Sequence, residues 1–129
     1  MPIITPKRIL IMEDDPVTAR AHRKCLSNAG YEVQIAHDGE HGLQLLKNCR
    51  PDALLLDINL PARNGIDILK ELRASNDSRN LPVFVFTAML TDETLAECSA
   101  AGATAVFEKF HLTSSLLLEA IASALSHPA

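Results

Sequence analysis

Five side chains that could act together on a phosphate group follow apolar, strand-like runs. The run 9–12 leads to Glu13 and Asp14, 54–56 to Asp57, 83–86 to Thr87, and 105–107, one residue further on, to Lys109. Because the strands of an open parallel sheet direct their carboxyl ends at one crevice, residues that follow different strands can meet there. Three acids, a hydroxyl and a lysine in one crevice predict a metal-assisted phosphate site.

The acids also predict which metal. Two carboxylates about 4 Å apart repel by about 4 kcal/mol at an effective dielectric of about 20, so Asp14 and Asp57 need a cation between them. Mg²⁺ is the natural choice, and Mn²⁺ can substitute, because Mg²⁺ prefers octahedral oxygen ligands, keeps several waters and uses one or two carboxylates beside a phosphate. Lys109 would give a phosphoryl oxygen a compact positive charge, and Thr87 a hydroxyl donor.

The elements that must position these residues follow from the hydrophobic pattern. Short apolar runs alternate with helix-length amphipathic segments, as in a parallel sheet with crossover helices. Strands are predicted at 8–12, 31–36, 53–56, 83–86 and 105–107. Four helices are predicted from their caps: from Asp15 to near Gly30, from Asp38 to near Asn48, from Thr91 to near Gly102, and from Thr113 to near Ser126. A further helix is predicted from about Gly65 to near Ala74. The unbroken apolar run 53–56 indicates a central strand that is buried on both faces.

Composition favours a single unit. The chain has 129 residues, 47% of them hydrophobic, which fits one domain over 1–129 with a core at about 7–126. A net charge of −4 offers no broad attraction to nucleic acid or to an anionic membrane. No apolar run approaches the roughly 20 residues that span a bilayer, and Met1–Pro6 has no hydrophobic leader, so a cytoplasmic location is expected.

The cysteines and histidines predict no further site. The three cysteines form no CxxC spacing, which favours reduced packing residues: Cys25, Cys49 and Cys98. The five histidines show no metal spacing beyond a weak pair at 37 and 41, and we expect them at the surface: His22, His37, His41, His111 and His127.

The ordered set of acids, hydroxyl and lysine resembles the receiver domain of bacterial two-component response regulators. The resemblance covers roughly residues 7–126 and includes the loop from Asp57 to Gly65, with proline four and glycine eight residues after the aspartate. It implies a flavodoxin-like α/β fold: a doubly wound, five-stranded parallel sheet in the order 2-1-3-4-5, flanked by five helices.

The resemblance also implies a role for each site residue. Asp57 would be the phosphoacceptor, and the metal would be held by Asp14, Asp57 and the backbone carbonyl of Asn59, with Glu13 acting through water. The phosphate would be contacted by Thr87, Ala88 and Lys109. Asn59 and Met89 would flank the path of attacking water and tune the phosphoryl lifetime, and the apolar Met89 favours slow to moderate self-dephosphorylation.

The implied function is that of a phosphoacceptor in a two-component phosphorelay. The donor would be a sensor histidine kinase or a histidine phosphotransfer protein, and the signal would pass by protein–protein contact. The chain would be a switch that catalyses its own phosphorylation and dephosphorylation, and not an enzyme with a separate substrate.

The output surface is expected on the helix from Asp92, the strand 105–107 and the helix after Thr113. There a downstream protein or a second copy would bind, without nucleic acid or membrane. The last helix supports this because it carries more apolar residues than one inward stripe requires: Leu116, Leu117, Leu118, Ile121 and Leu125.

Two positions depart from the family pattern. The residue after the lysine is Phe110 where the family normally has a cis proline, so a trans Lys109–Phe110 bond is expected, since a cis bond before a non-proline residue costs about 2.5–4 kcal/mol. Val106 stands where the family usually has an aromatic switch residue, with Phe107 one place later. The route of the signal from the site to the surface therefore differs from the usual one.

The sequence bears on three alternative classes of protein. A nucleotide binder would need a glycine-rich turn after the first strand, whereas the acidic sequence from Glu13 to Pro16 would repel phosphate. A haloacid-dehalogenase-like phosphatase would need a second aspartate where Asn59 stands, and a cap segment. The alternative that stays open is a receiver-like interaction module that works without phosphorylation.

Overall fold

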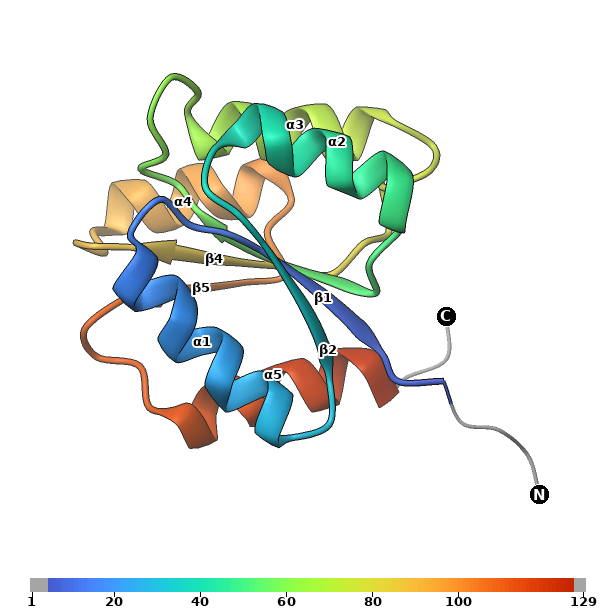
Figure 1. The fold of residues 1–129 in the computed structure, drawn as a ribbon. Helices are drawn as coiled ribbons and strands as arrows, with labels where there is room; N and C mark the ends of the chain where they lie inside the picture. The colour runs from blue at the N-terminus through green and yellow to red at the C-terminus, as the bar shows by residue number, and fades with distance from the viewer. Residues whose placement is uncertain (1–4, 127–129) are drawn as a thin grey trace.

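Five parallel strands form one sheet in the order β2-β1-β3-β4-β5, with helices on both faces (Figure 1). The computed structural model describes residues 5–126. The strands are β1 Arg8–Met12, β2 Glu32–Ala36, β3 Ala53–Asp57, β4 Val83–Thr87 and β5 Ala105–Glu108. The helices are α1 Pro16–Asn28, α2 Gly39–Cys49, α3 Gly65–Ala74, α4 Asp92–Ala101 and α5 Ser114–Ser126. The doubly wound fold and strand order expected from the sequence are confirmed.

Each face of the sheet has its own hydrophobic core. Helices α1 and α5 cover one face, and α2, α3 and α4 cover the other (Figure 1). Successive residues of a strand point to opposite faces, so Leu54 and Leu56 join the core under α2 to α4, whereas Ala53 and Leu55 join the core under α1 and α5. All five residues of β3 are buried, as its unbroken apolar run predicted.

The predicted helix starts are confirmed. Asp15, Asp38 and Thr91 cap α1, α2 and α4, each accepting a hydrogen bond from a backbone N–H three residues later. The Thr113 hydroxyl accepts the N–H of Leu116 at 3.2 Å at the start of α5. These caps fix where each helix leaves the carboxyl edge of the sheet, which is the edge that carries the candidate site.

The strands β3, β4 and β5 each end one residue later than predicted, and the start of β2 was predicted one residue too early. β2 begins at Glu32 and not at Tyr31, because the N–H of Tyr31 donates to the carbonyl of Leu26 and closes the end of α1. Gly30, with φ of +98°, supplies the left-handed residue that this closure needs.

Helix α4 is held mainly at its C-terminal end. Its buried residues are Cys98 and Ala101, both in the last turn. The Arg73 guanidinium, from α3, donates through Nε and Nη2 to the carbonyl of Gly102 at 3.0 and 2.8 Å. The positive charge of Arg73 also interacts favourably with the negative end of the α4 helix dipole.

Some sequence expectations concern residues beyond this range. Of the segment Met1–Pro6, residues 1–4 lie outside the described residues, as does His127. Within 5–126, none of the helices combines the length and the apolar content that crossing a membrane would take.

Gly102 and Gly30 provide a matched pair of substitutions, because both have φ near +100°. Nothing lies within 4 Å of a Cβ at Gly30, whereas a Cβ at Gly102 would lie 2.9 Å from Cγ and Nε of Arg73. We expect Gly30→Ala to lower the free energy of unfolding by about 1–2 kcal/mol through backbone strain. Gly102→Ala should lower it by at least about 1 kcal/mol more, through loss of the Arg73 hydrogen bonds. Equal losses in urea unfolding would show that Arg73 contributes nothing to this end of α4.

Candidate functional site

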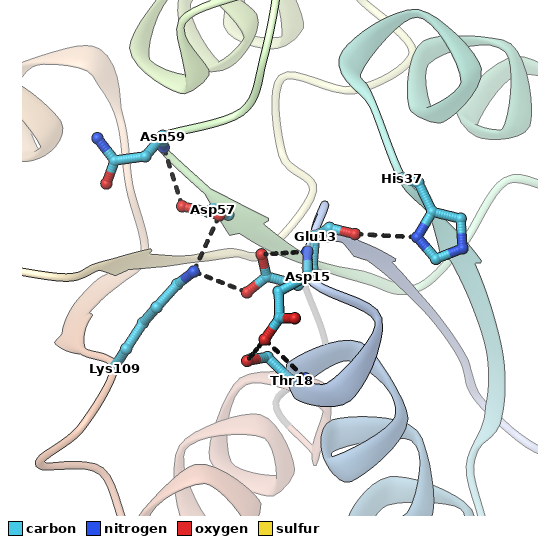
Figure 2. A network of polar contacts seen from close by, with 7 residues as sticks. All are labelled: Glu13, Asp15, Thr18, His37, Asp57, Asn59 and Lys109. Carbon is cyan, nitrogen blue, oxygen red and sulfur yellow. Dashed lines mark hydrogen bonds and ion pairs between the residues drawn. The ribbon is translucent and has the colours of Figure 1, made fainter.

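Lys109 joins two carboxylates at the carboxyl edge of the sheet. Its Nζ lies 2.8 Å from Oε1 of Glu13, which follows β1, and 2.9 Å from Oδ2 of Asp57, which ends β3 (Figure 2). Glu13 and Asp57 are each 3% exposed. Buried acids of this kind require a charged or hydrogen-bonding partner, and Lys109 supplies one to both.

A third carboxylate gives the site an excess of negative charge. One oxygen of each of Glu13, Asp14 and Asp57 lies within 4.8 Å of the others, and Asp14 is exposed. The cluster holds three carboxylates, and the ammonium group of Lys109 forms ion pairs with two of them. The donors are all oxygen and the exposed side leaves room for water ligands, which is the combination that Mg²⁺ prefers. The residues therefore fit a divalent cation.

Burial and a neighbouring acid raise the pKa of Glu13. Burial, and then the hydrogen bond to Asp57, raise the pKa of Glu13 from its ordinary 4.5 to about 7, although Lys109 opposes the shift. For Lys109, burial acts to lower the pKa, but hydrogen bonds to Glu13 and Asp57 outweigh it, so that the pKa is raised. A cation beside the acids would favour the ionised form of Glu13.

Both oxygens of Asp57 are engaged. Oδ2 faces Lys109, and Oδ1 accepts the backbone N–H of Asn59 at 2.9 Å (Figure 2). A carboxylate fixed at both oxygens has a set orientation at the end of the buried strand. Such fixing favours a reaction that needs a well-aimed oxygen.

The hydroxyl of Thr87 points along its own loop and not at Asp57. It ends β4, is 4% exposed, and donates to the backbone carbonyl of Met89 at 3.2 Å. The next two residues, Ala88 and Met89, are exposed. The structure thus brings together four of the predicted residues: Glu13, Asp14, Asp57 and Lys109. Thr87 lies at the end of the neighbouring strand, and its hydroxyl donates to the carbonyl of Met89 instead.

The loop from Asp57 to Gly65 packs closely because of Gly65. A Cβ there would lie 2.5 Å from the Cα of Ile58 and 2.9 Å from the carbonyl of Asp57, so a larger residue would push α3 away from the strand end.

Across the loop, Arg63 bridges α2 and α3 by ion pairs with Glu40 at 2.8 Å and Glu71 at 2.5 Å. These contacts were not predicted, because nothing local in the sequence pairs residues 8 and 23 positions apart.

His22 corrects the expectation that all histidines lie on the surface. It is partly buried, with its ring centroid 5.1 Å from that of Phe86, and burial, followed by the charge of Lys109, lowers its pKa. The signal was present in the sequence, since His22 falls at helical spacing between Ala19 and Leu26, which are both buried.

The two departures from the family pattern have clear structural outcomes. The bond between Lys109 and Phe110 is trans, as expected, since no cis bond occurs among the described residues, and Phe110 is 82% exposed. Val106 packs on the α2 to α4 side of the sheet, whereas Phe107 lies on the α1 and α5 side, 5.7 Å from Phe86 between ring centroids. The aromatic ring therefore occupies the opposite face from position 106.

The smaller expectations are also confirmed. Asp15 serves as a helix cap, accepting the N–H and the hydroxyl of Thr18 at 3.2 and 2.5 Å (Figure 2). The three cysteines are free, with Cys98 buried and the other two partly buried.

Comparison with known sequences points in one direction. The sequence model for the response regulator receiver domain matches residues 9–122, which include all five chemistry-bearing positions. Response regulator MprA from Mycobacterium sp. strain KMS is 41% identical over 83 residues, which are 64% of this chain and 35% of MprA. The chain spans about a third of the length of the curated relatives it matches.

Solved structures with the same architecture are similar over nearly the whole chain. A CheY-like response regulator receiver domain protein from Methanospirillum hungatei JF-1 has a TM-score of 0.86 at 30% identity, with 94% of each chain covered. The receiver domain of sensor histidine kinase PA1611 from Pseudomonas aeruginosa PAO1 has a TM-score of 0.86 at 26% identity, over 95% of this chain and 100% of that one. That domain was solved with a magnesium ion coordinated in its active site cleft.

The raised pKa of Glu13 predicts a pH dependence of stability in the metal-free protein. Between about pH 4.5 and 7 the folded chain binds more protons at Glu13 than the unfolded chain, so the contribution of Glu13 to the free energy of unfolding should fall as the pH rises. Glu13→Gln removes this titration. We expect the stability of wild type minus that of Glu13→Gln to decrease across this range in urea unfolding with a chelator, and to decrease less with excess Mg²⁺. A difference that stays constant with pH would contradict the shifted pKa.

Proposed function

Because the chain belongs to the family of response regulator receiver domains of two-component systems, we propose that Asp57 is its phosphoacceptor. The observation that supports this most directly is that Asp57 ends the fully buried central strand with one oxygen on Lys109 and the other on the N–H of Asn59. Asp57 also belongs to the carboxylate cluster, so a metal there would lie beside the reacting oxygen.

The proposed metal is Mg²⁺, with Mn²⁺ able to replace it. Asp14, Asp57 and the backbone carbonyl of Asn59 would hold it, and Glu13 would act through water. Support comes from the all-oxygen cluster in this chain and from the magnesium in the PA1611 receiver domain. When bound, the metal would neutralise charge on the acids and on the phosphoryl oxygens.

In the proposed reaction, a carboxylate oxygen of Asp57 attacks the phosphorus of a phosphohistidine. The new O–P bond forms as the P–N bond breaks, and the electron pair of that bond leaves with the imidazole, which takes up a proton. Lys109 stabilises charge on the phosphoryl oxygens, together with the Thr87 hydroxyl and the backbone at Ala88. Holding the acceptor at both oxygens reduces the ordering required in the transition state.

Hydrolysis of the acyl phosphate would reset the domain. Water would approach past Asn59 and Met89, which are both exposed beside the site. Neither side chain is charged, so neither can act as a base for that water at neutral pH, which supports slow to moderate self-dephosphorylation. In this sense the domain would catalyse its own phosphorylation and dephosphorylation.

The surface around the acidic site fits a protein donor, either a sensor histidine kinase or a histidine phosphotransfer protein. Three large apolar side chains are exposed there: Val17 at 67%, Met89 at 72% and Phe110 at 82%. They follow β1, β4 and β5, the strands that end beside the site. We propose that a donor which brings its phosphohistidine to Asp57 contacts these residues, and their burial would favour the complex. We call them the apolar rim.

The proposed output surface is the α4, β5 and α5 face, binding a downstream protein or a second copy. Leu95 of α4 is 42% exposed and Leu116 of α5 is 51% exposed, while every residue of β5 is only partly buried. Leu117 and Ile121 form the inward stripe of α5, so Leu116 is the excess apolar residue that the sequence indicated. We further propose that residues 1–129 act as one receiver domain, since both cores share one sheet.

Phosphorylation tests the assignment of Asp57 directly. Incubation with acetyl phosphate and Mg²⁺ should add one phosphoryl group to the wild-type protein by intact mass, and none to Asp57→Asn. Asp14→Asn keeps the acceptor but loses a metal ligand, so its rate should fall by at least about tenfold, the factor for about 1.4 kcal/mol. Labelling of Asp57→Asn at the wild-type rate would place the acceptor elsewhere, and an unlabelled wild type would favour a module that works without phosphate.

The apolar rim should matter for a protein donor and not for a small one. Phe110→Ala should slow transfer from a phosphorylated histidine phosphotransfer protein by about tenfold, because burying one large apolar side chain contributes about 1.5–3 kcal/mol. Its rate with acetyl phosphate should match wild type. Leu95→Ala, an exposed apolar residue on α4, is the control and should leave both rates unchanged. Equal slowing with both donors would mean that Phe110 supports the site and not the docking.

A further inference from the structure

Glu108, the last residue of β5, ties that strand to the loop between β4 and α4. Its Oε2 accepts the backbone N–H of Leu90 at 3.0 Å, and its Oε1 lies 2.9 Å from Nε2 of His111. Glu108 is partly buried and immediately precedes Lys109. The phosphoryl chemistry described above does not use its carboxylate.

The Leu90 N–H belongs to the same peptide group as the Met89 carbonyl, which accepts the hydroxyl of Thr87 at 3.2 Å. A peptide group is planar and moves as one unit. Thr87 therefore holds the carbonyl end of this group, and Glu108 holds its N–H end. Hydrogen bonds in such a chain polarise and strengthen one another.

The Thr87 hydroxyl has one proton to donate. While it donates to Met89 it cannot also donate to a phosphoryl oxygen on Asp57. Capture of the phosphoryl group by Thr87 therefore requires the bond to Met89 to break. A carbonyl that has lost its donor is free to turn, but Glu108 still restrains the other end of the same peptide group.

We propose that Glu108 is a positioning residue that holds the Met89–Leu90 peptide group in the arrangement of the unphosphorylated domain and so opposes phosphoryl capture by Thr87. The inference rests on the proposed function, in which Asp57 carries the phosphoryl group. The contact and a phosphoryl mimic oppose each other, because the contact is made only in the unphosphorylated arrangement. By thermodynamic linkage, the factor by which the contact lowers the affinity for the mimic equals the factor by which the mimic destabilises the contact.

The affinity for beryllium fluoride, a phosphoryl mimic, tests this inference in the presence of Mg²⁺. Glu108→Ala should bind it about fivefold more tightly than wild type, the factor that one net hydrogen bond commonly represents. Glu108→Gln keeps an oxygen acceptor for Leu90 without the charge, so its affinity should lie between the two. His111→Ala removes the other contact of the same carboxylate and should stay within about twofold of wild type, because the bond to Leu90 is kept.

Amide exchange gives a second readout, and its comparison of variants needs neither metal nor mimic. Leu90 should exchange faster in metal-free Glu108→Ala than in wild type, while the amides of β3 stay protected. In wild type, beryllium fluoride should speed exchange at Leu90, since its N–H loses Glu108.

The outcomes separate this inference from the proposed function. If wild type does not bind beryllium fluoride, the proposed function fails and the role of Glu108 fails with it. If wild type binds it and Glu108→Ala binds it equally well or more weakly, only the role of Glu108 is overturned. Should Glu108→Ala not fold, Glu108→Gln decides, and an affinity equal to that of wild type overturns the role.

Discussion

The ammonium group of Lys109, shared between Glu13 and Asp57, is the interaction on which the arrangement of this site depends. The three residues come from positions far apart in the chain. The parallel sheet, whose strand ends face one edge, brings an oxygen of each acid within 3 Å of Nζ of Lys109. The shared cation makes it possible to bury two acids. It does not balance three, and the remaining negative charge fits a divalent metal.

The partners of Asp57 have two uses as well. A carboxylate with both oxygens engaged is held still, yet its partners, an ammonium group and one backbone N–H, are groups that can also serve phosphoryl oxygens. In the proposed reaction, the site is therefore organised before the phosphoryl group arrives. Glu13 shows the cost of this organisation, since without a metal it is held at a pKa of about 7.

Much of this was predictable from the sequence, because the controlling signals are local. Caps such as Asp15 and Thr91 set the helix starts, and the unbroken apolar run 53–56 identified β3 as a central strand. The sequence did not predict the contacts that depend on the direction of a side chain or on residues far apart in the chain. A threonine at a strand end does not reveal that its proton goes to Met89, and no periodicity links Glu108 to Leu90. His22 was misjudged for a different reason, because residue type was given more weight than helical spacing.

The fastening of α4 to α3 has a mechanical consequence. The buried residues of α4 lie in its last turn, and Arg73 grips the carbonyl of Gly102 just beyond, while its first turn adjoins the loop that carries Met89 and Leu90. We therefore expect a displacement of the loop to tilt α4 about its C-terminal end at Gly102, with the largest movement at Asp92.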